Sequence, residues 1–157
     1  MSAADKYILL AEDDPNVAEL VQHALTMDAP APHIVHVLDG VEALNYLYAR
    51  GDFAQREPGN PAVVLLDMKM PRLDGLEVLR QIKKDPALKS TPVVMLTSSL
   101  DERDVRQSYL LGANAYVVKP IEFHRLIEAL KQIEGFWLKS NLPPPPLNPV
   151  HTFNPPV

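Results

Sequence analysis

The sequence predicts an α/β domain built from five strand–helix units around a parallel sheet. Short apolar runs alternate along the chain with segments in which apolar residues recur at helical spacing. Three of the apolar runs are continuous, which is typical of strands covered on both faces of a parallel sheet. The chain has 157 residues, enough for one domain with a substantial core.

The first two units follow one another directly. Their strands are expected at residues 7–11 and 33–38, and their helices at 15–25 and 41–48. Asp14-Pro15 is typical of an N-cap followed by a proline in the first helical turn. Asp39-Gly40 leads into the second helix. Apolar residues recur at intervals of three and four in both segments, which favours amphipathic helices.

A long loop at residues 51–61, rich in turn residues, precedes the last three units. The strands of these units are expected at 62–66, 93–96 and 115–118, and their helices at 73–84, 101–111 and 122–137. Gly112 stands where a C′ glycine would end the fourth helix. The last helix carries its apolar residues on one stripe, so it is expected to pack against the sheet.

Composition excludes several classes of protein. The net charge is −5, which leaves no basic footprint for nucleic acid or for an anionic membrane surface. The absence of cysteine excludes disulfides, thiolate metal sites and cysteine nucleophiles. No apolar run approaches the ~20 residues of a membrane span, and the start has no secretory signal pattern. We therefore expect a cytoplasmic protein that binds neither membrane nor nucleic acid.

Proline divides the chain into two parts. Seven of the 16 prolines lie in the last 20 residues. We expect a globular domain at residues 6–137 and a Pro-rich arm or tail at 138–157, which is too short to be an output domain. Whether this segment docks as a stiff arm or stays disordered is left open by the sequence.

Polar residues follow the expected strands in a pattern that predicts one functional site. Glu12 and Asp13 follow the first strand, Asp67 the third, Thr97 the fourth and Lys119 the fifth. Right-handed crossovers bring the carboxyl ends of parallel strands to one edge of the sheet, where ligands bind in this class of fold. A cluster of carboxylates without histidine or cysteine favours a hard cation such as Mg²⁺. A carboxylate can also accept a phosphoryl group, with the lysine neutralising its oxygens.

Four segments carry a resemblance to a known family. ILLAEDDP, LLDMKMPRLDG, VVMLTSS and GANAYVVKP resemble the signatures of the response-regulator receiver domain of two-component signalling, in the same order and at the same spacing. The resemblance implies a flavodoxin-like, doubly wound (βα)5 fold with a parallel five-stranded sheet in the order 2-1-3-4-5. It also implies that Asp67 accepts a phosphoryl group from a histidine kinase.

The same resemblance assigns the metal site. It implies that Mg²⁺ is bound by Asp13, by Asp67 and by the backbone carbonyl of Lys69, with Glu12 acting through water. Asp14 makes a run of three acids, and as the N-cap candidate it is expected to point away from the metal.

Further roles follow from the resemblance. Thr97 and Lys119 would contact the phosphoryl group, and Thr97 and Tyr116 would form a switch pair. Lys119-Pro120 matches a peptide bond that is often cis in this family. The expected function is that of a phosphoacceptor, which is not an enzyme and which signals by protein–protein contact or serves as a phosphate relay or sink.

A narrower resemblance concerns the long loop and the segment IEGFWLKSNLP, which are similar to those of single-domain regulators paired with phytochromes. It implies a phytochrome-type histidine kinase as partner. The apolar content of the last helix and of the tail also predicts a homodimer. The candidate contacts are Phe123, Phe136, Trp137, Leu138 and Leu142.

Two other functions stay open from the residues alone. One is an interaction module on a receiver scaffold that is never phosphorylated. The other is a phosphatase with an aspartate nucleophile, although such an enzyme would need an acid two residues after Asp67, where Lys69 stands. A flavin site and a nucleotide hydrolase are disfavoured because neither has its phosphate-binding loop here.

Overall fold

The computed structural model describes residues 6–145 and contains one parallel sheet in the order β2-β1-β3-β4-β5. The strands are β1 (Tyr7–Ala11), β2 (His33–Val37), β3 (Val63–Leu66), β4 (Val93–Thr97) and β5 (Ala115–Val118). All four neighbouring pairs are parallel. The predicted flavodoxin-like fold and strand order are confirmed.

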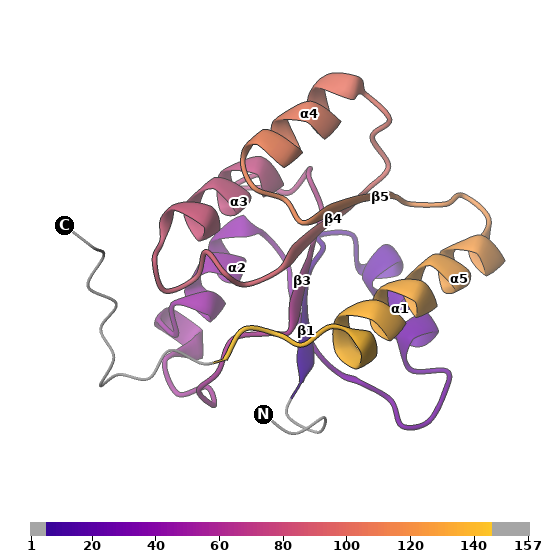
Figure 1. The fold of residues 1–157 in the computed structure, drawn as a ribbon, viewed down its shortest axis with the longest axis horizontal. Coiled ribbons are helices and arrows are strands. Elements are labelled where there is room, and N and C mark those ends of the chain that lie inside the picture. The colour runs from indigo at the N-terminus through magenta and orange to yellow at the C-terminus, as the bar shows by residue number, and fades with distance from the viewer. Residues whose placement is uncertain (1–5, 146–157) are drawn as a thin grey trace.

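Helices cover both faces of the sheet (Figure 1). They are α1 (Pro15–Leu25), α2 (Gly40–Leu47), α3 (Gly75–Lys84), α4 (Glu102–Leu110) and α5 (Phe123–Glu134). Four of them begin at an aspartate whose carboxylate accepts a backbone N–H of the first turn: Asp14, Asp39, Asp74 and Asp101. These caps satisfy donors that the helix itself leaves unpaired. In residues 6–145 we find no helix with the length and apolarity that crossing a bilayer requires.

The two faces of the sheet bury separate apolar clusters, because successive residues of a strand point to opposite faces. Leu9 and Ala11 of β1 belong to the cluster under α2 and α3, whereas Ile8 and Leu10 belong to the cluster under α1 and α5. The strand residues of β3 and β4 are buried on both sides. This double burial explains their continuous apolar sequence.

Two helices begin or end more than one residue away from their predicted bounds. Helix α3 begins two residues later than expected, at Gly75, because Asp74 serves as its N-cap. The last helix does not run unbroken to residue 137: α5 ends at Glu134 and continues as a π-helical segment, η3 (Gly135–Ser140). Within the expected loop 51–61, Gly51–Phe53 forms a short 3₁₀ helix.

The strand register brings the predicted polar residues to one edge. Ala11 pairs with Leu66, so the residues that follow β1 and β3 are neighbours. Thr97 at the end of β4 pairs with Val118 of β5, next to Lys119. The carboxyl edge of the sheet therefore gathers residues from four strands.

Candidate functional site

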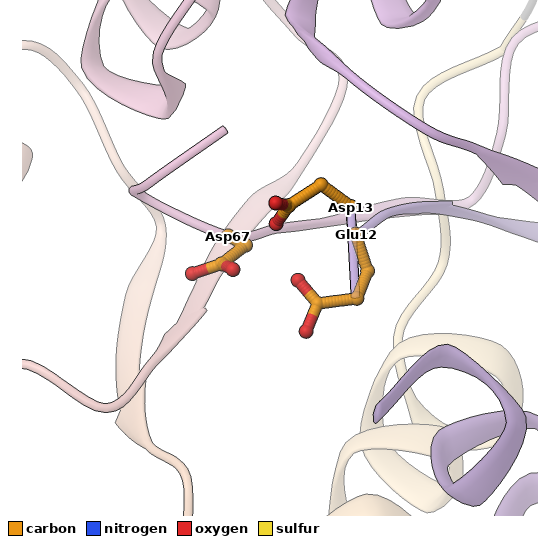
Figure 2. A group of neighbouring side chains, drawn as sticks. All are labelled: Glu12, Asp13 and Asp67. Carbon is orange, nitrogen blue, oxygen red and sulfur yellow. The ribbon is translucent and has the colours of Figure 1, made fainter. Parts of the chain in front are cut away.

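Three carboxylates meet at this edge. Glu12, Asp13 and Asp67 each offer an oxygen, and these oxygens lie within 4.8 Å of one another. Figure 2 shows the three side chains together where β1 and β3 end. Asp13 is exposed, Asp67 is half-buried and Glu12 is 2% exposed. The cluster is thus open to solvent on the side of Asp13 and closed at Glu12.

Lys119 faces two of the three carboxylates. Its Nζ lies 2.8 Å from Glu12 Oε1 and 3.4 Å from Asp67 Oδ2. One ammonium therefore stands against three acids, which leaves the group with an excess of negative charge when all of them are ionised. Repulsion of this kind is relieved either by a bound cation or by protonation of one acid.

Glu12 shows the consequence of that excess. Burial and the neighbouring Asp67 raise the pKa of Glu12 to about 8, although Lys119 acts in the opposite direction. Its Oε2 is buried and has no hydrogen-bond partner among the described residues. A buried carboxylate oxygen without a partner is costly, and a cation would satisfy it. The all-oxygen donor set suits Mg²⁺ or a similar hard ion.

Thr97 and Tyr116 are linked through a third residue. Thr97 is buried, and its Oγ1 accepts the backbone N–H of Ser99 at 3.4 Å. The Tyr116 hydroxyl donates to the Ser99 carbonyl oxygen at 3.0 Å. Lys69 borders a surface hollow that it shares with Asp13. The residues predicted for the metal, the phosphoryl group and the switch pair thus lie at or beside the same edge of the sheet.

Several residues that support the site were not predicted. Arg72, in the loop between β3 and α3, has a positive φ of 65° and pairs with Asp39 at 2.7 Å. A Cβ on Gly40 would overlap the carbonyl oxygen of Leu73, so the two loops pack backbone against backbone. These contacts hold the loop that carries Lys69. The only hint in the sequence is that an aspartate precedes both Gly40 and the glycine that begins α3.

His36 also supports the site from the edge strand. Its Nε2 lies 2.8 Å from the carbonyl oxygen of Glu12, to which it donates. This bond fixes the backbone of Glu12 beside β2. The histidine has no neighbour in the sequence that would indicate such a contact.

Two predictions are corrected by the structure. Within residues 6–145, the cis peptide bond lies at Ala29–Pro30 and not at Lys119-Pro120. Leu138 is buried in the cluster under α1 and α5, and Trp137 packs partly buried against the same cluster. Both residues contact the core because η3 extends α5 along the same apolar cluster, so Leu138 is not available to a partner.

Phe123, Phe136 and Leu142 are exposed, as a contact with a partner would require. The dimer itself stays a prediction. The predicted Pro-rich arm lies mostly outside the described residues, since the structure describes the chain only to residue 145.

Comparisons with known proteins agree with this geometry. Residues 8–131 match the response regulator receiver domain family. The response regulator Rcp1 of Synechocystis sp. is 38% identical over 135 residues, 86% of this chain and 90% of Rcp1. Its Mn²⁺-bound crystal structure has a TM-score of 0.82 at 37% identity and covers 89% of this chain and 99% of that one.

Two further solved structures are similar. The phosphorylated cyanobacterial phytochrome response regulator RcpA has a TM-score of 0.83 at 41% identity and covers 89% of this chain and 99% of that one. The bacteriophytochrome response regulator RtBRR is 51% identical, with a TM-score of 0.71 and coverage of 89% and 84%. Since the family match spans most of the sequence, the chain belongs to the response regulator receiver domain family.

Proposed function

We propose that the protein is a response regulator whose Asp67 accepts a phosphoryl group from the phosphohistidine of a histidine kinase. The observation that carries the proposal is Asp67 itself, a half-buried carboxylate with Lys119 Nζ at 3.4 Å and two further acids beside it. A carboxylate oxygen of Asp67 forms the new P–O bond. The P–N bond of the donor breaks, and its electron pair returns to the imidazole ring.

The other residues hold charge and geometry for this transfer. Lys119 neutralises an oxygen of the phosphoryl group, and the Thr97 hydroxyl donates a hydrogen bond to another. Asp13, Asp67 and the Lys69 carbonyl would hold Mg²⁺, with Glu12 acting through water. When bound, Mg²⁺ neutralises the charge that gathers on the phosphoryl oxygens.

The proposed partner is a phytochrome-type histidine kinase in the cytoplasm. Support comes from the similarity to RcpA and RtBRR, which are phytochrome response regulators, and to Rcp1. The protein then signals by protein–protein contact or passes the phosphoryl group on as a relay or sink. It catalyses no reaction on a separate substrate, and it binds no nucleic acid. The exposed Phe123, Phe136 and Leu142 are the proposed homodimer contacts.

Phosphotransfer followed by intact-mass measurement tests the acceptor. The wild-type protein should gain one phosphoryl group from acetyl phosphate with Mg²⁺, and gain it faster from a purified, autophosphorylated phytochrome kinase. Asp67→Asn should gain none, whereas Asp52→Asn, a change at an exposed acid of the 3₁₀ helix, should behave as wild type. An equal yield from Asp67→Asn would show that the acceptor is another residue. Transfer at the same rate from an unrelated kinase would remove the phytochrome assignment alone.

A further inference from the structure

Ser99, in the loop between β4 and α4, has all three of its polar groups engaged. Its N–H donates to Thr97 Oγ1 at 3.4 Å, and its carbonyl oxygen accepts the Tyr116 hydroxyl at 3.0 Å. Its own hydroxyl donates to Asp104 Oδ2 at 2.5 Å and accepts the Asp101 N–H at 3.3 Å. The backbone of this one residue therefore joins the two residues of the predicted switch pair, and its side chain ties that backbone to α4.

The hydrogen bond from the Ser99 hydroxyl to Asp104 is the strongest of these interactions. A hydroxyl–carboxylate hydrogen bond at this distance is charge-assisted and stronger than a bond between neutral groups. Helix α4 has few other anchors: Ser108 is its one buried residue. Figure 1 shows α4 on the outside of the molecule, beyond β4 and β5. The conformation of the loop therefore depends on a hydrogen bond at its edge rather than on deep burial of the helix that follows.

Asp104 also lies near two of the predicted metal ligands. Asp104 borders the same surface hollow as Asp13 and Lys69. Burial raises the pKa of Tyr116, a hydrogen bond with Ser99 lowers it, and the negative charges of Asp104 and Asp101 act in the same direction as burial. A change at Asp104 can thus reach Tyr116 through Ser99 or through charge alone.

We propose that Asp104 is a positioning residue: by holding the Ser99 hydroxyl, it fixes the loop that places the Thr97 hydroxyl and the Tyr116 ring beside the phosphoacceptor site. Only the expected effect of Asp104 on phosphorylation rests on the proposed function. The position of Tyr116 is fixed in the unphosphorylated protein as well, so this part can be measured without any phosphoryl transfer.

The first measurement is the ¹³Cζ resonance of Tyr116 in unphosphorylated protein labelled at tyrosine, assigned with Tyr116→Phe. Asp104→Ala and Ser99→Ala should each shift this resonance, because the Tyr116 hydroxyl loses its fixed acceptor. Asp104→Asn and Ser99→Thr retain the acceptor and the hydroxyl, and should restore the wild-type position. Asp101→Asn removes a neighbouring charge and keeps the Ser99–Asp104 hydrogen bond, so it should leave the resonance in place. This variant therefore distinguishes an effect of charge from an effect of the hydrogen bond.

The second measurement is the rate of phosphorylation by acetyl phosphate and Mg²⁺, followed by intact mass. Asp104→Ala and Ser99→Ala should each slow the reaction by about fivefold or more. The double variant should be no slower than the slower single variant, since both changes break one bond. Asp104→Asn should react at close to the wild-type rate.

The outcomes separate the two proposals. An unshifted Tyr116 resonance in both alanine variants overturns the positioning role, whatever the kinetics. A shift in Asp101→Asn and Asp104→Asn as large as in Asp104→Ala overturns it as well, because charge alone would then explain the effect. A shift with rescue by Asp104→Asn supports the role even if wild-type protein takes up no phosphoryl group, a result that would refute only the proposed function.

Discussion

Single residues set the charge of the site. Lys119 is shared by Glu12 and Asp67, and Asp13 has no cation within the ion-pair contacts of the described residues. The group is left with more negative charge than one lysine offsets when all three acids are ionised, and Glu12 Oε2 has no hydrogen-bond partner among the described residues. The free energy of the native state should therefore depend on divalent cations.

Mg²⁺ is expected to stabilise the fold. An ion that binds only the native cluster adds about 2.7 kcal/mol to the free energy of unfolding at a concentration of 100 Kd. Thermal melts in Mg²⁺ and in chelator should differ for wild type, and Asp13→Ala should remove most of the difference. Identical melting temperatures for wild type in both solutions would argue against the metal site.

The lowered pKa of Asp39 predicts that the free energy of unfolding depends on pH. Burial alone would raise the pKa of Asp39, but hydrogen bonds from the Glu42 N–H and the Arg72 guanidinium outweigh burial and lower it. A lowered pKa contributes stability that is present above the unfolded-state pKa of about 3.9 and is lost as pH falls through the folded-state pKa.

Asp39→Asn should therefore cost about 1 to 2 kcal/mol of unfolding free energy at pH 7. The difference from wild type should begin to shrink below about pH 4, where the unfolded chain takes up the proton, and should disappear once the pH falls below the lowered folded-state pKa of Asp39. Urea titrations at several pH values measure it, with Asp52→Asn as the exposed control. A difference that stays constant down to pH 3 would contradict the assignment.

At the scale of elements, the loops of the site are fixed by close backbone approach. Helix α3 begins directly over the residue that follows β3. A Cβ on Gly75 would overlap the carbonyl oxygen of Asp67 and lie 2.8 Å from Cα of Met68. Backbone atoms cannot move aside as a flexible side chain can, so the start of α3 and Asp67 form one rigid unit.

Gly75→Ala should thus lower the free energy of unfolding by about 1 to 3 kcal/mol and slow phosphorylation of Asp67. Gly135→Ala is the matched control, because Gly135 has a helical φ of −59° and nothing within 4 Å of an added Cβ. The control should leave stability unchanged or raise it by up to about 1 kcal/mol. Melts of the two variants that coincide would show that the contact at Gly75 relaxes without cost.

At the scale of the whole molecule, α5 and η3 present apolar side chains to solvent. Phe136 is 51% exposed and packs edge-on against Trp137, which is itself anchored to the core. Exposed apolar residues that are held rigidly favour an interface, because little side-chain entropy remains to be lost.

Phe136→Gln is expected to weaken the proposed homodimer. Light scattering at micromolar concentration should give a dimer for wild type and a larger monomer fraction for the variant. Leu38→Gln is the control. Leu38 is equally exposed, directly follows the edge strand β2 and lies outside the proposed contact, so this change should leave the mass unchanged. A monomeric wild type would refute the dimer, and equal masses for wild type and Phe136→Gln would refute the contact.

The order of the elements and the residues of the acidic cluster could be predicted from the sequence. Continuous apolar runs are sufficient to indicate buried parallel strands, and the residues after those runs must lie at one edge once the strands are parallel. Glu12, Asp13, Asp67 and Lys119 were therefore predictable without any knowledge of distances. Local chemistry was also enough for the cap at Asp14, since an N-cap depends on its own turn.

Only the tertiary structure decided what depends on contacts between distant segments. The pairing of Asp39 with Arg72, the engagement of Ser99 by Asp104 and the burial of Leu138 each depend on how the loops and helices pack. The residue pattern of a segment indicates its hydrophobic period and its helix caps. The features above depend instead on packing between segments that are far apart in the sequence.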